Sequence, residues 1–155
     1  MIVFDRVSKT YDGGLAALKD VSFTLGTGEM AFLTGHSGAG KSTLLRLILL
    51  MERASSGRVE VNGHDYGTLK GNGIAYARRR IGMVYQDHNL LDDRSIYDNV
   101  ALPLVINGLD AREIPNRVHA ALDMVGLGHR SKALPRALSG GEQQRVGIAR
   151  AVVSK

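Results

Sequence analysis

The sequence has no cysteine and no tryptophan, and only 5% of its residues are aromatic. Without cysteine the chain forms no disulfide and offers no thiolate, so we expect any bound metal ion on oxygen ligands. The sequence also lacks an apolar run long enough to span a membrane, and it shows no secretory signal. These absences predict a cytosolic protein.

The length and charge of the chain narrow its class further. With 155 residues it can bury the core of one domain but not of two independent ones. Its formal net charge is +5, yet the basic residues are scattered and the one compact run is Arg78 to Arg80. We interpret that run as a solvated helix face rather than as the alternative, a contact with nucleic acid or anionic lipid. We therefore expect no direct contact with nucleic acid.

The first half of the sequence alternates between strand and turn signals, with one helix. The leucine-rich segment from Lys41 to Glu52 predicts a helix buried against a sheet, and a glycine-rich loop precedes it. Strands are expected over Ile2 to Val7, Val21 to Leu25, Met30 to Leu33, Arg58 to Val61 and Ile81 to Tyr85.

The second half, from Ser95 to Pro135, has helical spacing. Apolar residues from Ile114 onward fall on one helical face, and Gly126 is a suitable terminator. Asp110 and Glu113 have the spacing of a capping box, but Pro115 favours a later helix start. A second helix is expected to open at Ser139. We interpret the helical stretch as an insertion packed on the first half rather than as a separate domain.

A phosphate-binding loop follows the strand predicted at Met30 to Leu33. The pattern G-x-x-x-x-G-K-[ST] covers Gly35, His36, Ser37, Gly38, Ala39, Gly40, Lys41 and Ser42, and Thr43 follows. Small residues let successive backbone N–H groups point at a polyphosphate, and the helix N-terminus adds positive potential. Lys41 would reach the β- and γ-phosphates and Ser42 would ligate Mg²⁺, so ATP and Mg²⁺ are the expected ligands. The alternative is a glycine-rich turn without a ligand, which the strand, loop and helix context disfavours.

A second anion-binding pattern lies about a hundred residues later. Ser139 and Glu142 have capping-box spacing, which would suffice to start a helix. Capping alone does not require Gly140 and Gly141. Two glycines at a helix N-terminus leave its N–H groups unshielded, which favours an anion site.

Together, the phosphate loop and the stretch from Leu138 to Arg145 resemble the ATP-binding cassette family over the whole chain. The resemblance implies an α/β fold: a P-loop core with a mixed or parallel sheet and antiparallel N-terminal strands, plus a helical subdomain. It divides the chain into a β-rich core (1–87), a helical subdomain (88–138) and a signature helix (139–155). It also implies a homodimer with ATP sandwiched between subunits, where Ser139, Gly140, Gly141 and Glu142 would meet the nucleotide bound by the other subunit.

The family resemblance assigns roles to two further residues. Tyr11 matches the aromatic residue on which adenine stacks; the alternative is a partly buried tyrosine at a strand end. Gln86 matches the glutamine that approaches Mg²⁺ and the attacking water. Together with the phosphate loop, this makes Lys41 and Gln86 the expected catalytic residues. Ser42 and Gln86 are the expected metal ligands. Residues 87–104 are then the candidate docking surface for an integral membrane partner.

Within the family, the resemblance is strongest to members that act in bacterial cell division. It is carried by Gly28 to Lys41, Gln86 to His88 and Tyr97 to Val100. It implies a peripheral ATPase subunit on the cytoplasmic face of the inner membrane. Two alternatives stay open: the ATPase of a lipoprotein-release or macrolide-type exporter, and a switch or scaffold that binds ATP without hydrolysing it. The segment Leu49 to Ala54 departs from the family pattern, with no functional meaning attached.

In the family, a strand after the signature helix carries the acidic residues that hold Mg²⁺ and polarise water. This sequence stops at Lys155, before any such residues. We therefore expect a fold that is incomplete at its C-terminus and a chain with strongly reduced hydrolysis alone. We also expect an unpaired sheet edge, an uncovered apolar face and low solubility.

Overall fold

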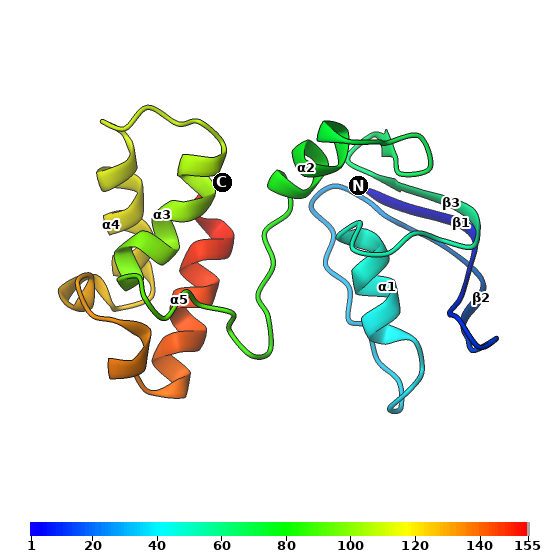
Figure 1. Cartoon of the computed structure of the whole chain (residues 1–155), viewed down its shortest axis with the longest axis horizontal. Helices are drawn as coiled ribbons and strands as arrows, with labels where there is room; N and C mark the ends of the chain where they lie inside the picture. Colours follow the sequence, from blue (N-terminus) through cyan, green and yellow to red (C-terminus); the bar gives the residue numbers. More distant parts are fainter. Residues whose placement is uncertain (155) are drawn as a thin grey trace. The chain divides into compact units, whose positions relative to one another are not determined.

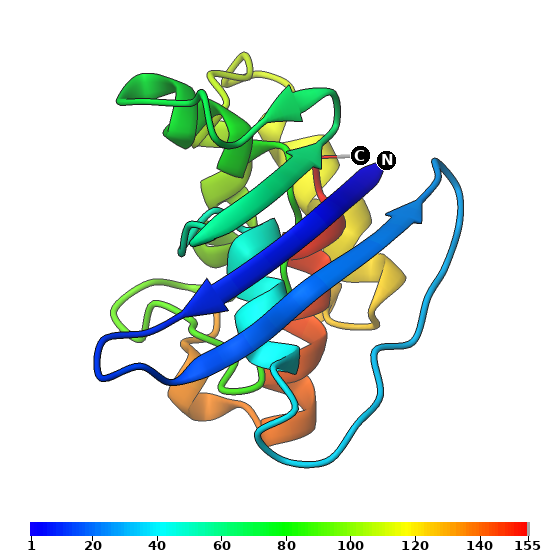
Figure 2. The same cartoon turned by 90° about the vertical axis from the view of Figure 1, so that its right-hand side faces the viewer.

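The computed structural model describes residues 1–154, which form two compact units, Met1–Arg78 and a second from Arg79 onward. Lys155, the last residue of the expected signature helix, lies outside the described residues. The first unit is built on a four-stranded sheet with the order β2-β1-β3-β4. Its strands are β1 (Ile2–Thr10), β2 (Ala16–Leu25), β3 (Ser56–Val61) and β4 (His64–Asp65). All the pairings are antiparallel, which confirms the antiparallel N-terminal strands (Figure 2).

Strand β1 is bulged, and the bulge decides which residues reach the core. Phe4 and Val7 are both buried, although strict alternation over three positions would place them on opposite faces. The register shifts between them, where Arg6 has a left-handed φ of 49° and donates its N–H to Ser22 Oγ at 2.8 Å. On the other strand, Phe23 lies opposite Phe4 with a ring-centroid distance of 4.7 Å.

Helix α1 (Lys41–Ile48) packs against β2 and β3 in the first unit (Figures 1 and 2). It ends four residues earlier than the predicted end at Glu52, because Leu50 turns left-handed at φ 53° and Met51 N–H bonds back to the Arg46 carbonyl. Helix α2 (Asn72–Arg79) follows, and Arg78 donates to the Leu50 carbonyl at 2.7 Å.

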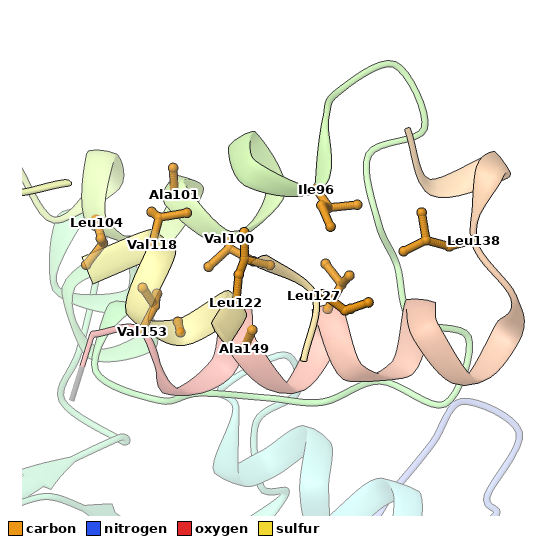
Figure 3. Packing of buried hydrophobic residues seen from close by; sticks show 12 residues of the cluster. Ile96, Val100, Ala101, Leu104, Val118, Leu122, Leu127, Leu138, Ala149 and Val153 are labelled. Carbon is orange, nitrogen blue, oxygen red and sulfur yellow. The ribbon is translucent and has the colours of Figure 1, made fainter. Parts of the chain in front are cut away.

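The second unit is a helical cluster, as predicted. Its elements are α3 (Ile96–Ile106), α4 (Ile114–Met124), α5 (Gly140–Val152) and the 3₁₀ turns η1 (Gly128–Arg130) and η2 (Pro135–Ala137). Apolar side chains of α3 and α4 meet those of α5 in one core, which Figure 3 shows with Val100, Leu122 and Ala149 at its centre. Burying these aliphatic groups is the main stabilising term for the cluster.

The helix starts in the second unit follow local sequence signals. Helix α4 begins at Ile114 with Pro115 in its first turn, so the later start is confirmed. Gly126 lies just beyond its end with a φ of 75°. Ser139 is the N-cap of α5, and both hydrogen bonds of the capping box with Glu142 are present.

The strands predicted at Met30 to Leu33 and at Ile81 to Tyr85 are wrong, because neither segment has strand structure. A strand exists only where a neighbouring backbone accepts its hydrogen bonds, and no segment among residues 1–154 pairs with either one. For the same reason the described sheet contains no parallel pair. Met30 and Phe32 are consequently 82% and 84% exposed, which agrees with the expected uncovered apolar face.

Candidate functional site

The glycine-rich loop depends on backbone conformations that favour glycine. Gly38 and Gly40 have φ values of 80° and 87°, and Gly40 is the left-handed N-cap of α1. A Cβ built on Gly40 would lie 2.5 Å from the carbonyl oxygen of Ala17 and 2.8 Å from Leu18 Cδ2. A side chain at Gly40 would therefore clash with β2.

The loop wraps around the ammonium of Lys41. Lys41 Nζ donates to the carbonyl oxygens of Gly35 and His36, each at 2.7 Å. His36 Nδ1 lies 2.7 Å from the carbonyl oxygen of Ser37, and because a carbonyl only accepts, Nδ1 is the donor. The positive charge is thus held by the loop whose N–H groups and helix terminus favour an anion.

Tyr11 and the phosphate loop border the same cavity of about 310 Å³. Tyr11 Oη lies 3.3 Å from Thr43 Oγ1, within hydrogen-bond distance. The lining residues are Tyr11, Leu15, Ala16 and Ala17 from the end of β1 to the start of β2, and Ser37, Gly38, Gly40, Lys41, Ser42 and Thr43 from the loop and α1. One aromatic ring, one ammonium and two exposed serine hydroxyls therefore share a hollow in the first unit.

The signature residues form the N-terminus of α5 in the second unit. Glu142 Oε2 accepts from Ser139 N at 2.8 Å and from Ser139 Oγ at 2.9 Å. These bonds, backbone first, hold the pKa of Glu142 below its ordinary value, with Arg130 adding a smaller contribution. A Cβ on Gly140 or Gly141 would meet no atom within 4 Å, so the helix terminus is open to a ligand.

Gln86 lies in an exposed turn of the second unit, next to Asp87. The predicted site residues thus divide into two groups. Tyr11 and the phosphate loop come together in the first unit, whereas Gln86 and the signature residues belong to the second.

Two features of these groups had no signal in the sequence. Arg150 donates to the carbonyl oxygens of His88 and Asn89, each at 2.7 Å, just after Gln86. Burial lowers the pKa of Arg150, and Nδ1 of His88 is buried without a hydrogen-bond partner among the described residues. Lys9, in the other unit, stands over the ring of Tyr11. The contacts of Arg150 join positions 61 and 62 residues apart, which no local pattern links.

The fold and the phosphate loop define a nucleotide-binding cassette, and the model of the ABC transporter family matches residues 18–155. The chain belongs to that family. It is similar to the cell division ATP-binding protein FtsE of Escherichia coli (strain K12), with 59% identity over 155 residues that cover 100% of this chain and 70% of that protein. FtsE of Haemophilus influenzae (strain ATCC 51907 / DSM 11121 / KW20 / Rd) is 52% identical over 156 residues, which cover 100% of this chain and 72% of that protein.

Solved structures agree with this assignment. The chain is similar to a dimeric ATP-binding cassette in a post-hydrolysis state bound to ADP and Pi, with a TM-score of 0.90 and 34% identity. The match covers 99% of this chain and 69% of that structure. Among residues 1–154, no helix is both long and apolar enough to cross a membrane.

Proposed function

We propose that this chain is an FtsE-like ATP-binding subunit, which couples ATP binding and hydrolysis to bacterial cell division through an FtsX-like integral membrane partner. The proposal places it at the cytoplasmic face of the inner membrane. It is supported by the 59% identity to FtsE over the whole chain together with the cavity that Tyr11 shares with the phosphate loop.

That cavity is the observation that carries the proposal, since its two sides suit the two ends of ATP. Tyr11 offers a ring face for the adenine base. The loop from Gly35 to Thr43 offers N–H groups and the Lys41 ammonium for the phosphates, and the Ser42 hydroxyl offers an oxygen for Mg²⁺. Bound Mg²⁺ would supply charge neutralisation on the phosphate oxygens, with Gln86 as its second ligand from this chain.

A second copy of the chain completes the site in this proposal. The open N-terminus of α5, with Ser139, Gly140, Gly141 and Glu142, would face the nucleotide held by the other copy. The similar cassette of known structure is a dimer, which supports this arrangement. ATP then lies between the two subunits, and residues 87–104 are the proposed docking surface for the membrane partner.

The test of the proposal is calorimetric titration of the chain with MgATP. We expect saturable binding by the unchanged chain and a loss of at least about tenfold in affinity in Lys41→Ala, because a charge-assisted contact to phosphate disappears. Lys70→Ala, which removes an exposed lysine of the same unit, is the matched control and should bind normally. No heat of binding in the unchanged, folded chain would refute the proposal.

The identity of the membrane partner needs a separate experiment. Affinity capture from detergent-solubilised membranes should recover an FtsX-like protein. Recovery of an exporter subunit instead would favour the lipoprotein-release or macrolide-type reading. A partner recovered without measurable ATP turnover in the assembled complex would favour the non-hydrolysing switch.

A further inference from the structure

Lys9 stands on the face of the Tyr11 ring. Its Nζ lies 4.9 Å from the ring centroid, within the distance at which an ammonium is attracted to an aromatic face. Tyr11 lines the cavity that it shares with the phosphate loop, whereas Lys9 does not belong to that lining among residues 1–154. The ammonium therefore acts on the ring without itself touching the cavity.

The ammonium of Lys9 is unusually shielded for a lysine at a strand end. Its side chain is only 13% exposed, although lysine side chains ordinarily extend their charge into water. Withdrawing an ammonium from water is costly unless an opposite charge accompanies it. Glu52 provides that charge, with Oε2 at 2.9 Å from Lys9 Nζ.

Glu52 lies in the segment Leu49 to Ala54 that departs from the family pattern, just beyond the end of α1. Thr43, in the first turn of α1, shares a hydrogen bond between its Oγ1 and Tyr11 Oη. Tyr11 is therefore held at two points: its hydroxyl by the start of α1, and its ring by a lysine anchored beyond the end of that helix. These contacts fix the tilt of the ring.

We propose that Lys9, anchored by Glu52, is a positioning residue for the adenine base. It occupies one face of Tyr11 and leaves the other for the base. This inference rests on the proposed ATP-binding function. A ring that is already oriented loses less conformational freedom when the nucleotide binds. A cation on one face also draws electron density from the ring, which strengthens stacking of an electron-rich purine on the other face.

In this proposal Lys9 affects the binding of the base and not of the phosphates. The test therefore compares MgATP with inorganic tripolyphosphate, which has no base. Both affinities are measured on the chain by calorimetry. We expect Lys9→Met to weaken MgATP binding about three- to tenfold and to leave tripolyphosphate binding unchanged. Lys9→Arg keeps the cation and should restore MgATP binding. Lys19→Met, which makes the same change at an exposed lysine of β2, is the matched control.

Each possible result of these titrations either supports or overturns the role of Lys9. Unchanged MgATP affinity in Lys9→Met, or an equal loss for both ligands in a folded variant, overturns the role of Lys9 alone. If circular dichroism shows that Lys9→Met is unfolded, Glu52→Gln decides instead: a smaller loss restricted to MgATP supports the proposal, and no loss overturns it. If the unchanged chain binds neither ligand, the proposed function itself fails.

Discussion

Arg150 binds the backbone carbonyl of His88 through Nη2 at 2.7 Å, across 62 positions of the sequence. The same guanidinium holds the carbonyl of Asn89. Both residues adopt left-handed φ values, 58° and 45°, that cost energy in residues other than glycine. The helix that begins at the signature residues thus stabilises the strained turn that follows Gln86.

Replacing Arg150 should destabilise the second unit. In Arg150→Ala the two carbonyls lose a charged donor, and we expect a loss of about 2 kcal/mol in the free energy of unfolding. Lys at this position has a single nitrogen and should recover only part of it. Chemical denaturation followed by circular dichroism measures the effect, with Arg145→Ala on the exposed side of α5 as the control. Equal stability of the two alanine variants would show that the turn does not need its anchor.

The capping box of α5 should make stability depend on pH. The pKa of Glu142 is lowered in the folded chain by its bonds to Ser139, so the folded state favours the carboxylate. Its contribution is complete above the pKa of the unfolded chain and is lost as the pH falls through the lower folded pKa. We expect Glu142→Gln to flatten the acid side of the stability profile. Asp92→Asn, an exposed change in the same unit, should leave that slope in place.

The hydroxyl of Ser139 makes its own contribution to the start of α5. Ser139→Ala removes the N-cap side chain and should cost about 1 kcal/mol in the free energy of unfolding. Thermal unfolding of the variant, compared with Ser139→Thr as the conservative control, measures the loss. A threonine variant as unstable as the alanine variant would assign the effect to something other than the cap.

Two glycines of the phosphate loop should respond very differently to alanine. Gly40→Ala combines a left-handed backbone with a Cβ 2.5 Å from the Ala17 carbonyl oxygen, so the loop has to move away from β2. Gly38→Ala meets the same backbone strain in open space. We expect Gly40→Ala to lose most of its affinity for MgATP. We expect Gly38→Ala to lose about 1 kcal/mol in the free energy of unfolding. Similar MgATP affinities in the two would mean that the close approach at Gly40 is dispensable.

Ser139→Arg tests the role of the signature in a dimer. A bulky cation at the open N-terminus of α5 should block the second copy while leaving the phosphate loop untouched. Light scattering after size exclusion, with and without MgATP, should show a monomer with normal nucleotide affinity. An ATP-dependent dimer that persists in this variant would contradict the proposed sandwich.

The features that the sequence predicts well are those with local causes. Ser139 and Pro115 mark helix starts through their own side chains and ring, and the spacing of the phosphate loop encodes its turns. The prediction of a strand at Met30 to Leu33 was wrong because a strand needs hydrogen bonds from a neighbouring strand elsewhere in the chain. The contacts of Lys9 with Glu52 and of Arg150 with His88 join positions far apart in the sequence. Hydrophobic periodicity does not predict which charged side chains are buried, so these contacts could not be predicted.

The left-handed conformation of Arg6 forms a bulge in β1, so the orientation of the later residues of the strand depends on this one position. Arg6 adds one position between Phe4 and Val7, and every later side chain of the strand takes its side from that addition. We expect deletion of one residue between Phe4 and Val7 to remove the bulge and to shift the later residues of β1 by one position. The spacing of the residues ahead of Tyr11 thus matters to the site along with the chemistry of Lys9.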